Sequence, residues 1–152
     1  MSQYHQFVLF LLFAFPITVI DMRECRIPDF LSLGGVAVFA ALKLLTGEQS
    51  PVQVLAECLV GFGVFWLIWR FTGGQLGLGD AKYSMLIAVA AGFSAWFAAL
   101  LFASLAGLVV AGIMIRGLKL DRRTRIPFAP FLTMGTVLAI HCGDVLGVRL
   151  FI

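Results

Sequence analysis

The sequence predicts an all-α polytopic membrane protein with six transmembrane helices. Apolar residues make up 61% of its 152 residues and charged residues only 12%, against about 45–50% and about 25% in soluble globular proteins. The mean hydropathy of +1.03 leaves too little polar surface to keep a folded globule of this size in water. Charge-free stretches also recur along the chain, most of them near the ~20 residues that a helix needs to cross the hydrocarbon core.

The positions of the charges define the first three spans. Residues 2–20 carry no charge, and no basic residue precedes them and no small-x-small cleavage signal follows them. We therefore predict a retained span rather than a signal peptide. The polar segment 21–29 separates it from the second span, residues 30–45. Lys43 lies near the far end of this span, where a long side chain can reach the interface. Residues 52–71 are the predicted third span.

The second half of the chain contains one stretch that is too long for a single span. It follows a glycine-rich loop at residues 72–80, and residues 83–115 are 33 residues without a charge. They would make about 50 Å of helix at 1.5 Å per residue, too long for one crossing of a ~30 Å core. Gly92-Phe93-Ser94 offers a break that divides the stretch into a fourth and a fifth span. A basic segment then precedes the sixth span, which begins at Ile126.

The distribution of basic residues favours six spans. With six spans, nine of the eleven basic residues face one side, whereas a single crossing of residues 83–115 would divide them five to six. The positive-inside rule prefers the first arrangement. We therefore expect the loops at residues 21–29, 73–80 and 116–125 to be cytoplasmic, and residues 1–152 to form one domain embedded in the cytoplasmic membrane. The nine basic residues are Arg23, Arg26, Arg70, Lys82, Arg116, Lys119, Arg122, Arg123 and Arg125; the other two are Lys43 and Arg149.

The pattern indicates no metal, cofactor or nucleic-acid site. Cys25, Cys58 and Cys142 lie far apart without a CxxC motif, and His5 and His141 are expected near the face opposite Cys25, so no zinc site is predicted. The net charge of +3 is small, and we interpret it as loop sidedness rather than as a nucleic-acid footprint. Membrane lipid is the partner that the composition indicates.

The acidic residues are the candidates for chemistry, because an ionisable group at a membrane boundary is costly. Asp21 directly follows an apolar stretch and Asp80 precedes one, both on the expected cytoplasmic side. Two carboxylates in a partly dry site share a proton, and the pair can activate water while protonating a carbonyl or a leaving amine. The alternatives are that Asp80, after Gly79, is a helix N-cap and that Asp21 is an ordinary interfacial charge. Glu57, inside the third span, is either a buried functional acid or part of an ion pair near the outer interface.

Three motifs resemble those of type IV prepilin peptidases. Gly77-Leu78-Gly79-Asp80-Ala81-Lys82 resembles the GxGDxK signature of that family. Ile20-Asp21, followed by Arg26-Ile27-Pro28-Asp29, resembles its first-aspartate motif, and Ile126-Pro127-Phe128-Ala129-Pro130-Phe131 is similar to its late I-P-F-x-P segment. The motifs occur in the family's order, each at an expected cytoplasmic edge, and together they cover nearly the whole chain.

The resemblance implies a GxGD-type aspartyl endopeptidase of the cytoplasmic membrane. Such an enzyme removes the short basic leader of prepilins or pseudopilins after a glycine, at the cytoplasmic face, and the chemistry needs no metal or cofactor. The residues that match the family's site are two aspartates, two loop glycines, the motif lysine and the start of the second span. In this chain they are Asp21 and Asp80 as the catalytic pair, with Gly77, Gly79, Lys82, Pro28 and Asp29 supporting the loop and the substrate.

The chain also departs from the family's larger members. Those carry an N-terminal cytoplasmic domain with paired CxxC motifs and methylate the new N-terminus. Met1 leads almost directly into the first span here, so we expect a short form similar to the peptidases of tight-adherence (Flp-type) pilus systems. Tyr83 stands where the family often has an aliphatic residue, and Ala129 where glycine is common.

Two other functions remain open from the sequence. A small ion-coupled transporter or channel subunit would use Glu57 or Asp80 in a path across the bilayer, and would not need both aspartates at one face. A catalytically inert pilus-assembly partner would keep the fold alone. A close approach of Asp21 and Asp80 favours the peptidase over the transporter.

Overall fold

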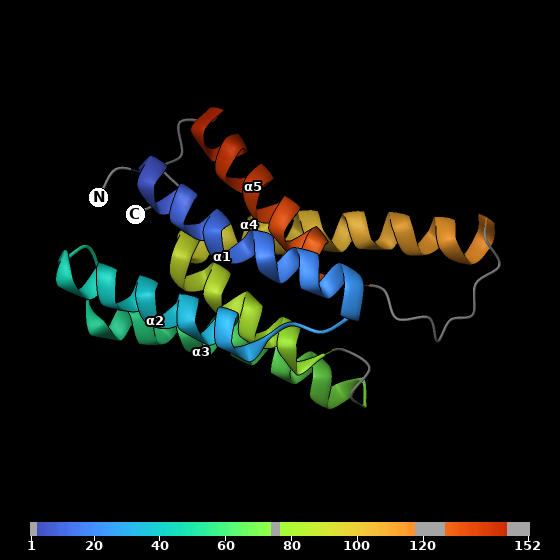
Figure 1. Ribbon diagram of the computed structural model, residues 1–152, viewed down its shortest axis with the longest axis horizontal. Coiled ribbons are helices and arrows are strands. Elements are labelled where there is room, and N and C mark those ends of the chain that lie inside the picture. Colours follow the sequence, from blue (N-terminus) through green and yellow to red (C-terminus); the bar gives the residue numbers. More distant parts are fainter. Residues whose placement is uncertain (1–2, 74–76, 118–126, 146–152) are drawn as a thin grey trace.

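The computed structural model describes residues 3–73, 77–117 and 127–145, and the regular structure in these ranges is entirely helical. The elements are α1 (Gln3–Glu24), α2 (Asp29–Leu45), α3 (Pro51–Phe71), α4 (Leu78–Gly117) and α5 (Ala129–Val145). Figure 1 shows α2 and α3 side by side, α1 next to them, and the second half of α4 and α5 crossing at an angle to each other.

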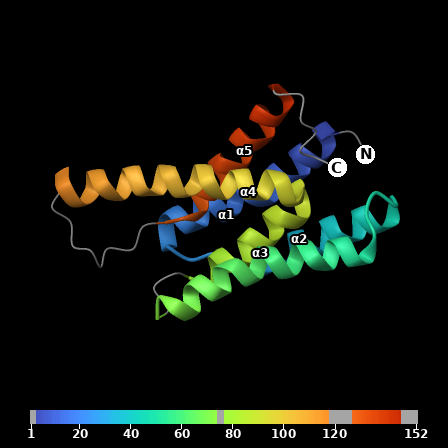
Figure 2. The same ribbon diagram turned by 180° about the vertical axis from the view of Figure 1, so that it is seen from behind.

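α4 is divided by a kink at the glycine where the sequence predicts a break. Gly92 has φ 81° and ψ 167°, a conformation that glycine adopts without the steric cost of a side chain. The helix is thereby split into residues 78–91 and 93–117, which run in different directions when the molecule is seen from behind (Figure 2). The predicted break is confirmed.

The ends of α1 and α4 differ from the prediction in a way that matters for the site. α1 continues past Ile20 to Glu24, and α4 begins at Leu78, so Asp21 and Asp80 lie in terminal helical turns rather than in loops. α1 ends because Cys25 takes a left-handed conformation, with φ 49°, and its N–H donates to the carbonyl of Asp21 at 2.8 Å. This is a common way to close a helix, although glycine is the usual residue there.

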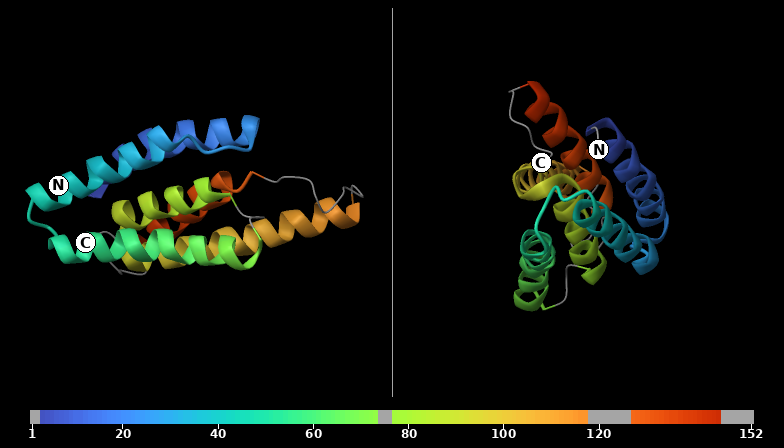
Figure 3. Two further views of the ribbon diagram at one scale, coloured as in Figure 1. Left: turned by 90° about the horizontal axis from the view of Figure 1, so that it is seen from below. Right: turned by 90° about the vertical axis from the view of Figure 1, so that its left-hand side faces the viewer.

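Within the residues that the structure describes, three helices are long and apolar enough to cross a membrane: Tyr4–Glu24, Pro51–Phe71 and Leu78–Ile113. α2, with 17 residues, and the apolar part of α5, Ala129–His141, are shorter. The connections alternate between two ends of the molecule. The α1–α2 connection and the start of α4 lie at one end, and the α2–α3 turn and the kink of α4 lie at the other (Figure 1; Figure 3, left).

The first half of α4 is the centre of the core. It packs against α2, α3 and α5, and the side chains from Leu86 to Ala91 are fully buried. Small residues allow the close approach of its neighbours, as is typical of helices that pack in membranes. A Cβ at Gly61 of α3 would lie 2.9 Å from the Cα of Met85, and a Cβ at Gly135 of α5 would meet the backbone at Ala99.

The sequence predicts that the Lys43 side chain reaches the membrane interface, but in the structure this side chain is buried. Its side chain is only 3% exposed, and its Nζ lies 3.6 Å from Oε2 of Glu57, which is itself buried. Gln49 donates to the other oxygen of Glu57 at 3.0 Å. The partner carboxylate on α3 is what makes burial of the lysine possible, because a buried charge is tolerated only when it is paired. Of the two alternatives for Glu57, the structure contains the ion pair.

Part of the predicted cytoplasmic surface is outside the described residues. The basic loop expected at residues 116–125 is described only at its first two positions, and Ile126 and Arg149 are likewise outside the described ranges.

Candidate active site

A cavity of about 220 Å³ lies where the end of α1, the start of α2 and the start of α4 meet. Six of the seven predicted site residues line it, although they come from two segments, residues 21–29 and 77–82, that are distant in the sequence. The lining residues are Asp21, Cys25, Arg26, Ile27, Asp29, Gly77, Leu78, Gly79, Asp80 and Lys82.

Pro28 is the predicted site residue that does not line the cavity. It occupies the N-cap position directly before α2, with φ −72°, rather than a place inside the helix. Its carbonyl accepts the N–H groups of Leu31 and Ser32 at 3.2 and 3.3 Å. Pro28 therefore fixes where α2 begins and so places the adjacent Asp29 at the cavity.

Asp21 is held by the N-terminus of α5. Its side chain is almost fully buried, and its Oδ2 accepts the backbone N–H of Ala129 at 2.9 Å. The backbone N–H of Phe128 is a second donor to the same carboxylate. The first N–H groups of a helix have no partner within the helix, and the helix dipole makes its N-terminus favourable for a negative charge. Asp21, at the end of α1, thus caps the N-terminus of α5, although the two are 108 residues apart in the sequence.

Sequence reasoning did not identify Phe128 and Ala129 as neighbours of Asp21. The available signal was the proline-flanked segment at residues 126–131, since proline is favoured at the first turn of a helix. That signal locates the start of a helix, but nothing in the spacing shows which side chain the free N–H groups meet.

Asp80 faces the same cavity from the first turn of α4. Its carboxylate accepts the backbone N–H of Gly77, as an acidic residue at the third helical position does when it reaches back to the N-cap. The charge of Asp21 acts directly on Asp80. Because two carboxylates that line the same partly buried cavity cannot both ionise easily, the pair is suited to hold one proton between them.

The two glycines of the 77–80 segment permit close contacts. A Cβ on Gly79 would lie 2.9 Å from the Cβ of Ile27, a buried residue of the α1–α2 connection. A Cβ on Gly77 would lie 3.2 Å from Oδ2 of Asp80. Neither glycine is among the described residues with positive φ, so the requirement at Gly79 is for space rather than for a left-handed turn.

Two of the residues that line the cavity form an ion pair. Nζ of Lys82 donates to Oδ2 of Asp29 at 2.5 Å, and both side chains remain partly exposed. The pair joins the fifth residue of α4 to the first residue of α2. It thus connects the last residue of the Gly77–Lys82 motif with the last residue of the first-aspartate motif, Asp29.

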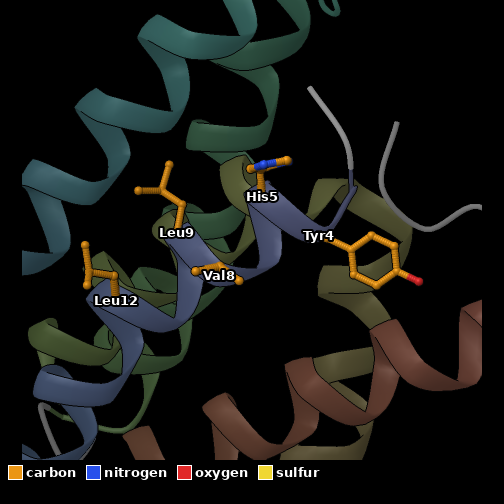
Figure 4. Close-up of a pocket in the computed structure, with 5 residues that line it drawn as sticks. All are labelled: Tyr4, His5, Val8, Leu9 and Leu12. Carbon is orange, nitrogen blue, oxygen red and sulfur yellow. The ribbon is translucent and has the colours of Figure 1, made fainter.

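A second cavity is apolar and lies at the other end of α1. It has a volume of about 430 Å³ and is lined by Tyr4, His5, Val8, Leu9 and Leu12 (Figure 4). No acidic side chain lines it, and its nearest lining residue, Leu12, lies between two and three helical turns before Asp21. Within the described part of the chain, no group of three His, Cys, Asp or Glu side chains is arranged to hold a metal ion.

Comparison with curated proteins finds relatives named prepilin leader peptidase/N-methyltransferase. The chain is 28% identical to the protein of Bacillus subtilis over 137 residues, which are 90% of this chain and 55% of the relative. It is 32% identical to the protein of Pseudomonas aeruginosa over 136 residues, 84% of this chain and 46% of the relative. It is also 32% identical to that of Pectobacterium carotovorum over 136 residues, with 86% and 48% covered. The chain thus spans about half the length of the curated relatives it matches.

No solved structure matches the chain significantly. A family model described as the type IV leader peptidase family matches residues 8–112. This range contains both Asp21 and Asp80, as well as the other residues that line the cavity between them. The chain therefore belongs to the type IV leader peptidase family.

Proposed function

We propose that this chain is a membrane aspartyl endopeptidase that removes the leader from type IV prepilins or pseudopilins. The observation that carries the proposal is that Asp21 of α1 and Asp80 of α4 line one cavity. The relatives' printed names support a prepilin as the substrate. A transporter that used Asp80 alone would have no need of the second aspartate.

In the proposed mechanism the two aspartates act as a unit that holds one proton. The ionised carboxylate takes a proton from a water molecule, and the water oxygen bonds to the carbonyl carbon of the leader–mature peptide bond. The protonated carboxyl donates its proton to the carbonyl oxygen. The tetrahedral gem-diol then collapses: the C–N bond breaks as the protonated carboxyl gives its proton to the leaving nitrogen. One diol hydroxyl gives its proton to the ionised carboxylate, so that the pair again holds one proton.

The surrounding residues would hold this arrangement and admit the substrate. Gly77 and Gly79 keep the loop before Asp80 free of side chains, so that the backbone of a substrate can approach. Lys82 and Asp29 link α4 to α2 beside the cavity, and Pro28 sets the first residue of α2. We assign these five residues supporting roles.

We further propose a six-span topology with the active site at the cytoplasmic face of the inner membrane. Three features support it: the kink at Gly92 divides the longest apolar helix, the connections alternate between two ends (Figure 1), and the basic residues are concentrated in three loops. On this proposal residues 1–152 act as one membrane-embedded peptidase domain. Its basic loops lie against anionic lipid headgroups.

The experiment is to incubate the purified chain in liposomes with a candidate prepilin and to read the products by mass spectrometry. The proposal expects two fragments whose masses place the cut directly after a glycine at the end of the leader. An intact substrate, with correctly folded protein and several prepilins tried, would favour the inert assembly partner instead.

A further inference from the structure

Three hydroxyl groups from three helices meet beside the aspartates. Oγ1 of Thr133 lies 2.7 Å from Oγ1 of Thr18 and 2.6 Å from the hydroxyl oxygen of Tyr83. Thr133 also donates to the carbonyl of Ala129 at 2.9 Å. We call Thr18, Tyr83 and Thr133 the hydroxyl node.

One arrangement of protons satisfies every hydrogen bond of Thr133. A threonine hydroxyl has one proton and two lone pairs, and the proton of Thr133 is used on the carbonyl of Ala129. Thr133 therefore accepts from Thr18 of α1 and from Tyr83 of α4. All three hydrogen-bonding positions of Thr133 are satisfied. Tyr83 is fully buried, where an unmade hydrogen bond is costly.

Each member of the node lies one helical turn from a component of the candidate site. Thr18 is three residues before Asp21, and Tyr83 is three residues after Asp80. Thr133 is four residues after Ala129, whose N–H is donated to Asp21. Residues three or four apart share a helix face. The node therefore lies directly beneath the site on all three helices that build it.

The packing of the helices gives this node a particular importance. α5 packs against both α1 and α4, whereas α1 and α4 are not among the closely packed pairs within the described part of the chain. The hydrogen bonds through α5 are therefore one of the links that hold Asp21 and Asp80 relative to each other. The direct hydrogen bond of Tyr83 with Thr18 and the contact of Gly79 with Ile27 are others. Thr133 is the residue of α5 that bonds to both helices.

We infer that Thr18, Tyr83 and Thr133 are positioning residues that set the separation of Asp21 and Asp80 by bonding α1 and α4 to the same point of α5. The inference rests on the proposed function. None of the three lines the cavity, so they act on the reaction through the aspartates and not by contact with the substrate. Because displacement of a reacting group by 1 Å can cost about 100-fold in rate, loss of one hydroxyl should reduce kcat more than it changes KM.

The test compares isosteric variants of the node with matched variants elsewhere. Tyr83→Phe, Thr133→Val and Thr18→Val each remove one hydroxyl of the node. Thr136→Val is the control in the same helix, since Thr136 is also buried and donates to a carbonyl four residues earlier, that of Leu132. Ser84→Ala is the control in α4, because it removes a buried hydrogen bond from Trp96 that lies outside the node.

We expect Tyr83→Phe and Thr133→Val to lower kcat by about 10- to 100-fold. Their KM should stay within about threefold of that of the unaltered protein. All five variants should have comparable thermal stability. Thr133→Ser keeps the hydroxyl and should restore most of kcat. The double variant of Thr18→Val with Thr133→Val should lose less than the product of the two single losses, because both break the same bond.

The inference is overturned if Tyr83→Phe and Thr133→Val both keep kcat within twofold of the unaltered protein. It is also overturned if the control variants, Thr136→Val and Ser84→Ala, lower kcat as much as these two node variants. If the proposed function itself is wrong, the unaltered protein does not cleave the prepilin at all, and this outcome is distinct from the two above.

Discussion

Both aspartates of the candidate site are oriented by backbone N–H groups. Two such groups, from Phe128 and Ala129, are directed at Asp21, and one from Gly77 is directed at Asp80. A carboxylate held by backbone donors has few alternative rotamers, and such preorganisation lowers the cost of reaching a reactive geometry. Substitutions that shift these backbone segments should therefore affect cleavage even when both carboxylates remain.

Gly79 provides a test of this dependence. Gly79→Ala places a Cβ 2.9 Å from the Cβ of Ile27, and Gly79→Val adds two further methyl groups. Overpacking of this kind costs about 1–3 kcal/mol, and the strain acts on the contact between α4 and the connection that follows Asp21. We expect Gly79→Val to suppress cleavage strongly and Gly79→Ala to do so partly. Cleavage is to be measured together with the amount of protein in the membrane.

Leu78→Val is the matched control, since Leu78 is partly exposed at the adjacent position and should tolerate the change. Full activity of Gly79→Val at normal abundance would show that this close approach has no role in forming the site.

The pair of Lys43 and Glu57 is expected to contribute to stability and not to chemistry. Glu57→Gln leaves a buried lysine without its counter-charge, and removal of one partner of a buried pair costs about 3–5 kcal/mol. We predict a clear drop in the thermal midpoint of unfolding, with kcat unchanged for the fraction that is folded. The double variant with Lys43→Met should regain much of the lost stability, since the unpaired charge is gone.

Thermal unfolding and cleavage rates of the single and double variants measure both parts of this prediction. A loss of kcat in the folded Glu57→Gln variant would indicate that Glu57 is a functional acid. It would favour the alternative function, a small ion-coupled transporter.

At the scale of helices, the ion pair of Asp29 and Lys82 joins α2 to α4 beside the cavity. Exposed pairs of this kind are worth about 0.2–1 kcal/mol, so Lys82→Met should lower stability only slightly and cleavage by less than about tenfold. Asp29→Lys places two like charges at the contact and should be worse. The combined exchange, Asp29→Lys with Lys82→Asp, restores an opposite-charge pair and should recover part of the activity.

Initial cleavage rates of the two single charge reversals and of the combined exchange decide between two roles. If the combined exchange is no more active than its weaker single variant, the two side chains act separately, for example on the substrate.

The helices themselves were largely predictable from the sequence, because charges and glycines mark where apolar stretches end. The kink at Gly92 and the starts of α2 and α3 follow from these local signals. The partners of the side chains were not predictable. Lys43 was expected at the interface because its position in its own helix is near an end, and the carboxylate that allows its burial belongs to α3.

The same limit applies to the candidate site. Motif resemblance paired Asp21 with Asp80, and the cavity that both line agrees with that pairing. The donors from α5 and the hydroxyl node were missed, because threonine and tyrosine in an apolar helix give no signal of which helix they face. Such contacts depend on how the helices cross, and periodicity within a single helix does not record that.

For the whole molecule, the six-span topology predicts which cysteines are accessible from each side. Cys25 is exposed beside the cavity and should be cytoplasmic. In a variant with Cys58→Ala and Cys142→Ala, a membrane-impermeant thiol reagent should label Cys25 in inverted vesicles and not in intact spheroplasts. Adding Thr46→Cys with Cys25→Ala, at an exposed position of the α2–α3 turn, should give the reverse pattern. Labelling of both positions from the same side would contradict the topology.

The central claim is that Asp21 and Asp80 together perform the cleavage, and the most direct measurement is the turnover of Asp21→Asn, Asp80→Asn and the double variant on a prepilin substrate. Asn preserves size and some hydrogen bonding while removing the acid–base function, which is worth about 10²–10⁴-fold in rate. At equal amounts of folded, membrane-inserted protein, the turnover of each single variant is predicted to fall at least about 100-fold. The turnover of the double variant should be no lower than that of the less active single variant, because the two residues act as a unit. Near-normal turnover by either single variant would contradict the claim.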